Sequence, residues 1–203
     1  MNCLQIFSKT PVPGQVKTRL QPTLSPQECA QLHKWLLLQT LQVASKSGQD
    51  NIQLWCYPTT QHDFITEMQQ RFQLELRVQQ GFDLGERMLN ALNQGLKDND
   101  AVILIGSDCP FFTTDYINEA LLLLESDLDM AIGPAKDGGF VLVAANKPMP
   151  KELFEGIAWG KKSVLEETLK RAKDNKIRYE MLQPLQDIDR PEDLELINQR
   201  YIV

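Results

Sequence analysis

A lone carboxylate follows a strongly apolar run in the middle of the sequence. Residues 101–105 read Ala-Val-Ile-Leu-Ile, which is typical of a fully buried strand, and Asp108 comes two residues after Gly106. Ligands in open α/β sheets bind just beyond the carboxyl ends of the strands, so an acid here can hold a metal ion over a bound phosphate. Asp in such a place also often orders only its own turn. The stretch by itself leaves both interpretations open.

Three cations gather in the loop after the first predicted strand, which covers residues 4–7. This loop contains Lys9, Lys17 and Arg19 around Gly14. We expect its backbone N–H groups and cations to cradle a di- or triphosphate, although the earlier glycine of a P-loop is missing. A solvated basic loop is the alternative. So many cations in a short stretch of an acidic chain favour phosphate binding.

Two later loops place glycines and charged residues at the ends of predicted strands. In the first, Gly81 permits close backbone approach to a ligand, and Arg87 is as consistent with the same crevice as with the surface. In the second, Asp137-Gly138-Gly139 is a hairpin signal. Its functional interpretation is a second carboxylate beside backbone that approaches a small substrate.

Asp189 precedes the last predicted helix. Taken alone, its position favours a helix cap over a functional role.

The elements that must position these residues alternate along the whole chain. Apolar runs predict strands at 4–7, 51–57, 74–78, 101–105, 129–134, 141–145 and 177–182, with helical patterns between them. Capping boxes at Ser25–Glu28 and Ser163–Glu166 predict two helix starts. Alternation of this kind indicates βαβ units on a mostly parallel sheet. We predict one α/β/α domain over residues 1–203, with 129–145 adding an antiparallel element at one edge.

Composition narrows the function classes. The net charge of −6 argues against nucleic acid as the main partner but not against a nucleotide. The sequence has no apolar stretch long enough for a membrane span and no secretion signal, so we expect a cytoplasmic protein. The cysteines are scattered and predicted to be free thiols, and the two histidines, His33 and His62, lie far apart. A zinc site is therefore disfavoured, and a hard ion held by carboxylates and phosphates is favoured.

Four stretches in register resemble a known family. They are residues 7–20 (FSKTPVPGQVKTRL), 106–110 (GSDCP), 133–140 (GPAKDGGF) and 187–194 (DIDRPEDL). Together they resemble a bacterial family of GT-A-like nucleotide-diphospho-sugar transferases, glycosyltransferases that include an arsenosugar-biosynthesis type. The family is distantly similar to 2-phospholactate guanylyltransferase and molybdenum cofactor guanylyltransferase. The resemblance covers most of the chain and implies a three-layer α/β/α GT-A fold with a mostly parallel mixed sheet.

The resemblance also implies roles for particular residues. The first loop would hold the nucleotide phosphates, with Lys17 and Arg19 as cationic contacts. Asp108 would bind Mg²⁺ or Mn²⁺, and Asp189, together with Asp187, would approach the metal from the far side. Asp137 and the Gly138–Gly139 backbone would lie near the transferred group or the acceptor.

Two activities follow from this pattern. The first is a metal-dependent glycosyltransferase with a nucleotide-diphospho-sugar donor and a small-molecule acceptor. The second is a nucleotidyltransferase that joins an NTP to a phosphorylated small acceptor and releases pyrophosphate. A departure from many GT-A glycosyltransferases favours the second, because the sequence has Ser107-Asp108-Cys109-Pro110 in place of Asp-x-Asp. A catalytically silent nucleotide-binding protein is a third possibility, against which the retained acids and cations argue. Nothing in the sequence points to a particular base, acceptor or oligomeric state.

Overall fold

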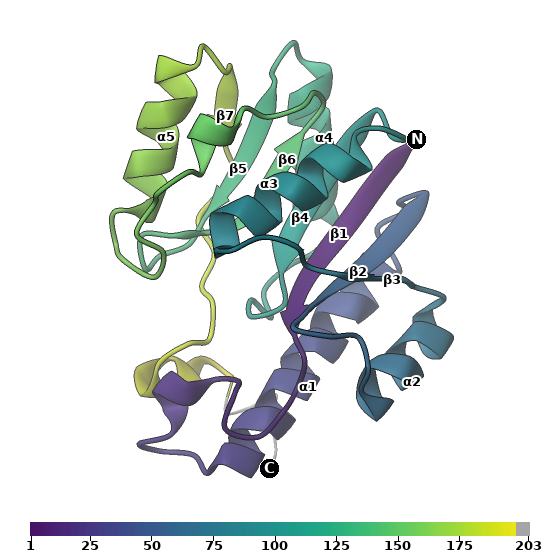
Figure 1. The fold of residues 1–203 in the computed structure, drawn as a ribbon, viewed down its shortest axis with the longest axis vertical. Coiled ribbons are helices and arrows are strands. Elements are labelled where there is room, and N and C mark those ends of the chain that lie inside the picture. Colours follow the sequence, from purple (N-terminus) through teal and green to yellow (C-terminus); the bar gives the residue numbers. More distant parts are fainter. Residues whose placement is uncertain (198–203) are drawn as a thin grey trace.

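The computed structural model describes residues 1–197 and contains one seven-stranded sheet in the order β3-β2-β1-β4-β6-β5-β7 (Figure 1). The last six residues of the predicted domain lie outside the described range. The strands are β1 (Asn2–Lys9), β2 (Asn51–Tyr57), β3 (Glu75–Val78), β4 (Ala101–Gly106), β5 (Met130–Pro134), β6 (Phe140–Ala145) and β7 (Tyr179–Met181). The helices are α1 (Pro26–Ala44), α2 (Asp63–Phe72), α3 (Leu84–Gly95), α4 (Thr114–Glu125) and α5 (Val164–Asp174), with short 3₁₀ helices η1 (Thr18–Leu20), η2 (Lys151–Leu153) and η3 (Pro191–Leu196).

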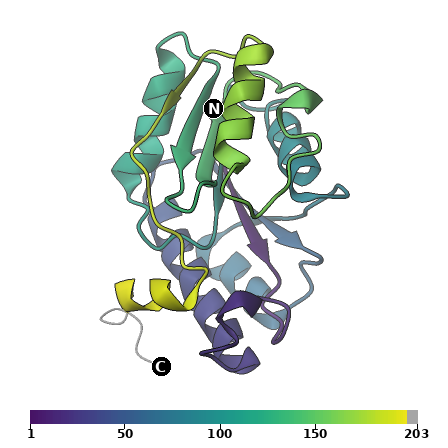
Figure 2. The ribbon, with the colours of Figure 1, turned by 90° about the vertical axis from the view of Figure 1, so that its left-hand side faces the viewer.

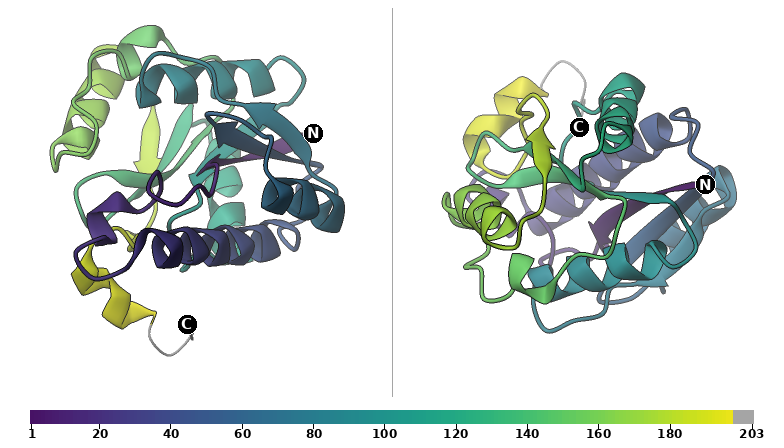
Figure 3. Two further views of the ribbon diagram at one scale, coloured as in Figure 1. Left: turned by 60° about the horizontal axis from the view of Figure 1, so that its bottom comes forward. Right: turned by 90° about the horizontal axis from the view of Figure 1, so that it is seen from above.

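Helices cover both faces of this sheet, which gives the predicted three layers (Figure 3). Successive residues of a strand point to opposite faces, so Ile103 and Ile105 of β4 pack into the core with α1, α2 and α4. Val102 and Leu104 pack into the second core, with α3 and α5. Both faces of β4 are therefore buried, as its continuous apolar sequence predicts.

The antiparallel strand lies inside the sheet, so the prediction that residues 129–145 form an edge element is wrong. β6 pairs antiparallel with β4 on one side and with β5 on the other, while β7 runs parallel to β5 at the edge. The reason is burial. Residues 141–145 are all buried and need a neighbour on each side, whereas β7 is short and largely exposed, as suits an edge.

One predicted helix cap forms and the other does not. Ser25 and Glu28 exchange side-chain to backbone hydrogen bonds at the start of α1, as a capping box requires. Ser163 has helical backbone angles and makes no capping bond; its hydroxyl instead lies 2.7 Å from a Glu167 carboxylate oxygen. The cap that forms matters for the site, because it fixes the start of α1, and α1 carries His33, whose Nδ1 lies 3.6 Å from Asp108 Oδ1.

After β7 the chain descends beside the first loop and ends its described part in η3 (Figure 2). Residues 182–190 of this descent are called the strap below. Ile188 of the strap is fully buried in a small apolar cluster with Leu20 of η1 and with Leu32 and Leu36 of α1. This cluster fixes the strap against the first loop at the carboxyl end of the sheet.

Candidate nucleotide-binding site

One cavity of about 620 Å³ opens at the carboxyl ends of β1, β2 and β4. The residue after β3, the start of α3, the start of β6, His33 of α1, the first loop and the strap also line it. Seven of the residues singled out in the sequence line it: Lys9, Lys17, Arg19, Arg87, Asp108, Asp187 and Asp189. Residues from five separate parts of the chain thus meet at the place where α/β sheets bind ligands.

Lys17 is the most deeply buried of these cations. Its side chain is 3% exposed, and its Nζ donates to the Ile188 carbonyl at 2.6 Å and lies 2.8 Å from Asp108 Oδ1. The backbone at Lys17 has φ +50°, a left-handed conformation that few non-glycine residues adopt. The alternative of a solvated basic loop is therefore wrong for Lys17, which connects the first loop to the strap and to β4.

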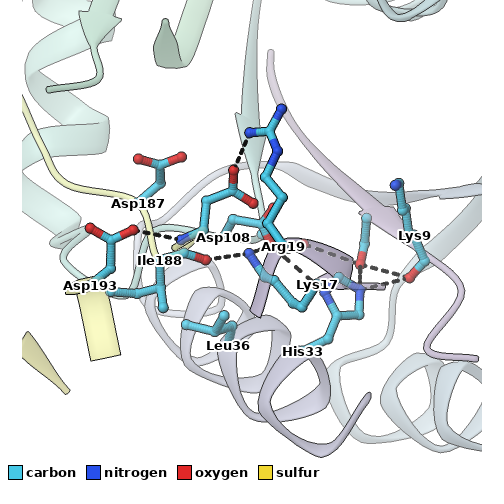
Figure 4. Close-up of polar contacts among 12 residues, drawn as sticks. Lys9, Lys17, Arg19, His33, Leu36, Asp108, Asp187, Ile188 and Asp193 are labelled. Carbon is cyan, nitrogen blue, oxygen red and sulfur yellow. Dashed lines mark hydrogen bonds and ion pairs between the residues drawn. The ribbon is translucent and has the colours of Figure 1, made fainter. Parts of the chain in front are cut away.

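Asp108 has one buried oxygen and an otherwise open side chain. Its side chain is 46% exposed, yet Oδ1 is buried against Lys17 and 3.6 Å from Nδ1 of His33 (Figure 4). Burial acts to raise the pKa of this carboxyl, but Lys17 and His33 outweigh it and hold the pKa well below its usual range. Its backbone carbonyl accepts a hydrogen bond from Ile188 N at 2.9 Å, which fixes the strap beside it. Asp108 is therefore ionised, with its second oxygen available on the cavity side.

The two strap acids differ in their partners. Asp189 Oδ2 accepts from Arg19 Nη1 at 2.5 Å. It does not cap η3, because Asp193 is the side chain that accepts from the Asp189 and Arg190 backbone N–H groups. Asp187 lines the cavity, and burial, followed by the charges of Asp137 and Asp108, raises its pKa to about 6. A carboxyl with a raised pKa beside other acids favours a bound cation.

Tyr57, Gln79 and Arg87 line the part of the cavity formed by the end of β2, the residue after β3 and the start of α3. The Arg87 guanidinium lies 4.0 Å from the centre of the Tyr57 ring, and its Nε donates to the Asp83 carbonyl. Gln79 directly follows β3 and donates through Nε2 to the Ser8 and Trp55 carbonyls at 3.2 and 2.9 Å. The cavity wall therefore contains the stacked Arg87–Tyr57 pair and the Gln79 amide in addition to the acids and the buried Lys17.

Several residues predicted to contact ligand do not line the cavity: Gly14, Gly81, Asp137, Gly138 and Gly139. Packing explains two of these glycines. A Cβ at Gly81 would lie 2.8 Å from Arg87 N, and one at Gly138 would lie 2.2 Å from the Lys162 carbonyl oxygen. Asp137 Oδ1 accepts from Gly139 N at 2.8 Å within the predicted hairpin turn. The roles proposed for these residues toward the substrate or its phosphates stay predictions, and Asp137 is near enough to influence Asp187.

The sequence reasoning missed His33, Tyr57 and Gln79 as cavity residues. His33 had a usable signal, because it falls among Cys29, Leu32 and Leu36 on the buried face of a well-capped helix. A polar side chain at such a position needs buried partners. Its partners come from β1 and β4, which are far away in sequence, so no spacing rule identifies them.

Comparison with solved structures defines the class of protein. A structure from Desulfovibrio desulfuricans G20, described as a "putative nucleotide-diphospho-sugar transferase", matches with a TM-score of 0.87 and 31% identity over 98% of this chain and 86% of that one. A cytidylyltransferase from Leptospira borgpetersenii serovar Hardjo-bovis has a TM-score of 0.64 at 14% identity, over 100% and 88% of the two chains. The 4-diphosphocytidyl-2C-methyl-D-erythritol synthase of Anaerococcus prevotii has a TM-score of 0.63, also at 14% identity, over 98% and 95%. The last two likenesses show the fold alone.

These findings confirm the predicted fold and place the chain among the transferases of the nucleotide-diphospho-sugar transferase fold. The chain belongs to the bacterial family described as "Uncharacterized protein conserved in bacteria (DUF2064)", whose model matches residues 40–161. No curated protein matches it. None of the helices within residues 1–197 is long and apolar enough to cross a membrane.

Proposed function

We propose that the protein is a metal-assisted transferase that binds a nucleotide-diphospho-sugar donor in this cavity and transfers the sugar to a small-molecule acceptor. The observation that carries the proposal is the convergence of the first-loop cations and Asp108 on one cavity at the carboxyl end of the sheet. The 31% identity to a protein described as a nucleotide-diphospho-sugar transferase supports the choice of donor. The identity of the acceptor is open.

The residues of the chain would act mainly on phosphate charge. Transfer breaks the bond between the sugar carbon and the diphosphate oxygen, and the negative charge on the departing nucleoside diphosphate grows in the transition state. Fixed cations beside that oxygen stabilise the transition state without rearranging during the reaction. Lys9 and Arg19 lie on the cavity wall, and Lys17 supplies a buried positive charge behind Asp108.

The carboxylates fit a divalent cation only if the substrate completes its coordination. Among residues 1–197 there is no cluster of three His, Cys, Asp or Glu side chains able to enclose a metal. Asp108 and Asp187 both line the cavity, and Mg²⁺ commonly binds through one or two carboxylates plus substrate phosphates. We therefore assign these two acids to Mg²⁺ or Mn²⁺, which when bound would neutralise the diphosphate. Asp189 then acts from further out, through Arg19.

Nucleotidyl transfer is the second candidate. The observation in its favour is that a single acid followed by Cys109-Pro110 comes after β4, where many metal-dependent glycosyltransferases of this fold have two acids. The same cations and acids would then stabilise pyrophosphate as it leaves an NTP. The two reactions differ in the bond that breaks, C–O or P–O.

A two-stage experiment separates these activities. Thermal shift with NTPs and nucleotide-diphospho-sugars, each with and without Mn²⁺, identifies the ligand class, because a ligand that binds only the folded state raises the melting temperature with its concentration. Incubation of the best ligand with candidate acceptors then shows whether nucleoside diphosphate or pyrophosphate is released. Release of nucleoside diphosphate from a sugar donor supports the proposal. Pyrophosphate release replaces it with nucleotidyl transfer, and failure of every nucleotide to bind rejects both.

A further inference from the structure

His33 is a buried polar side chain without an assigned role. It is 3% exposed and lies on α1 beside the apolar cluster that holds the strap. A buried imidazole destabilises the fold unless its nitrogens have partners, so those partners indicate why the residue is there. The two ring nitrogens face different parts of the site.

The Nε2 side of the ring is anchored to the end of β1. Nε2 lies 2.9 Å from the Lys9 carbonyl oxygen and 3.1 Å from Ser8 Oγ. A carbonyl can only accept, so Nε2 carries a proton and donates it to Lys9. The Ser8 hydroxyl also donates to that carbonyl and accepts from Ser107 at the end of β4. The plane of the imidazole is thereby fixed relative to both central strands.

The Nδ1 side of the ring faces the candidate metal ligand. Nδ1 lies 3.6 Å from Asp108 Oδ1 and is buried without a hydrogen-bond partner among the described residues. Lys17 Nζ approaches the same oxygen at 2.8 Å. Since Oδ1 is enclosed while the Asp108 side chain is 46% exposed, the exposed part of the carboxylate is the Oδ2 side.

We propose that His33 is a positioning residue that fixes the rotation of the Asp108 carboxylate, so that Oδ2 faces the cavity. Rotation about the last side-chain bond of Asp is broad, and the ion pair that Lys17 makes with one oxygen does not by itself set the plane of the carboxylate. The planar imidazole, anchored at Lys9, closes the side of Oδ1 and leaves one orientation. The orienting role of His33 does not depend on the proposed function. Its expected consequence does, because that consequence is tighter binding of a diphosphate with its metal ion at Asp108.

Two substitutions separate the two faces of the ring. In His33→Asn the amide nitrogen takes a place near Nδ1 and the bond to Lys9 is lost. In His33→Gln the amide nitrogen takes a place near Nε2, so the bond to Lys9 remains and the contact with Asp108 is lost. His33→Ala removes both. Calorimetric titration with inorganic pyrophosphate and Mn²⁺ measures binding at Asp108 independently of the nucleoside, and thermal unfolding reports on the fold.

We expect the His33→Asn variant to bind pyrophosphate within about 3-fold of the wild-type affinity. The His33→Gln and His33→Ala variants should bind it about 10-fold or more weakly. A purely structural role at Lys9 predicts the reverse order, and that result, or full affinity in His33→Gln, overturns the proposal. Ligand-free crystal structures of the wild type and the His33→Gln variant test the proposal without any ligand. An Asp108 carboxylate that keeps its wild-type orientation in the His33→Gln variant also overturns the proposal. If neither pyrophosphate nor any nucleotide binds the wild type with Mn²⁺, the proposed function fails, while the crystal structures still decide the role of His33.

Discussion

Two aspartates of this protein share a chemistry but not a role. Asp108 follows β4 by two residues at the cavity, and Asp129 precedes β5 at the opposite end of the sheet. Each has two basic side chains as neighbours, Lys17 and His33 for Asp108, and Arg178 and Lys147 for Asp129. At Asp129 the hydrogen bond from Arg178 is the largest cause of a lowered pKa, and at Asp108 the contacts with Lys17 and His33 prevail over burial. In both, the pKa lies well below the usual range.

The difference lies in what the second oxygen does. The Asp129 side chain is 5% exposed, and both of its oxygens accept from protein groups at 2.9 to 3.4 Å. Asp108 is 46% exposed and has protein partners only at Oδ1 within the described chain. A lowered pKa therefore does not identify a binding site by itself, because a saturated structural carboxylate has one too. The unfilled oxygen at a cavity is the distinguishing feature.

Changing each aspartate to Asn is the strongest test of this comparison. Asp108→Asn keeps the size of the side chain and removes the charge, so we expect it to fold and to lose most of the gain in nucleotide affinity that Mn²⁺ gives the wild type. The loss should be about 10-fold or more, equivalent to about 1.4 kcal/mol. Calorimetric titration with and without Mn²⁺ measures it. A wild-type gain in the Asn variant contradicts the assignment of Asp108 as metal ligand.

Asp129→Asn is the matched control at the structural cluster. It weakens charged hydrogen bonds from Arg178 and Lys147, so we expect a loss of about 2 kcal/mol of unfolding free energy in urea and unchanged nucleotide affinity. If this variant lost Mn²⁺-dependent binding as Asp108→Asn does, the contrast between the two aspartates would be false.

Lysine-to-methionine substitutions extend the comparison of Asp108 and Asp129 to the lysine that pairs with each of them. Lys17 is 3% exposed and Lys147 is 50% exposed. Lys17→Met removes a buried charge and leaves the Ile188 carbonyl without its donor, which should cost about 1–3 kcal/mol of unfolding free energy. Lys147→Met removes a surface partner and should cost less than about 1 kcal/mol. Equal effects in urea unfolding would show that the burial of Lys17 has no energetic consequence.

The sequence predicts most of the elements because each signal is local. The continuous apolar run at 101–105, the capping box at Ser25 and the hairpin signal at 137–139 each depend on neighbouring residues, and all three agree with the structure. The position of β6 between β4 and β5 is not local. It depends on which strands bury residues 141–145, and an alternating pattern of strands and helices does not specify that.

The site divides in the same way. The first-loop cations and Asp108 are recognisable because they follow predicted strands, and the structure brings them to one cavity. The burial of Lys17 depends on the strap, whose Ile188 is more than 170 residues away along the chain. The contact with Asp108 depends on His33 of α1, about 75 residues before it. The sequence does not distinguish Asp187 from Asp189, because both precede the same predicted helix and only the tertiary structure separates their partners.

Asp189→Asn tests the outer acid of the strap. Asp189 and Arg19 are a half-exposed pair, so the stability change should be below about 1 kcal/mol. If Asp189 orients Arg19 toward phosphate, Mn²⁺-dependent nucleotide binding should fall by about 3-fold to 10-fold, and Arg19→Gln should produce the same fall. Calorimetry on both variants measures this. Full affinity in Asp189→Asn with a loss in Arg19→Gln would show that Arg19 acts without Asp189.

The last prediction concerns Asp187 and pH in metal-free buffer. Its folded pKa of about 6 lies above the ordinary value of 3.8, so the folded state holds a proton that the unfolded state has released between these values. The stability that this proton provides is complete below the unfolded pKa and is lost as pH rises through about 6. Asp187→Asn cannot ionise. It should therefore be more stable than the wild type by about 1–2 kcal/mol near pH 7.5, after allowance for solvent screening.

The pH dependence of that difference is the critical measurement. Thermal unfolding with a chelator should show the advantage of Asp187→Asn shrinking to near zero by about pH 4, because both proteins are then neutral at this position. Excess Mn²⁺ should reduce the advantage near neutral pH, since only the carboxylate gains from a bound cation. The stability difference between Asp129→Asn and the wild type should not change with Mn²⁺, because the saturated Asp129 carboxylate offers the ion no free oxygen. An advantage for Asp187→Asn that stayed constant with pH would mean that Asp187 is ionised throughout and that its neighbouring acids are already compensated by the protein.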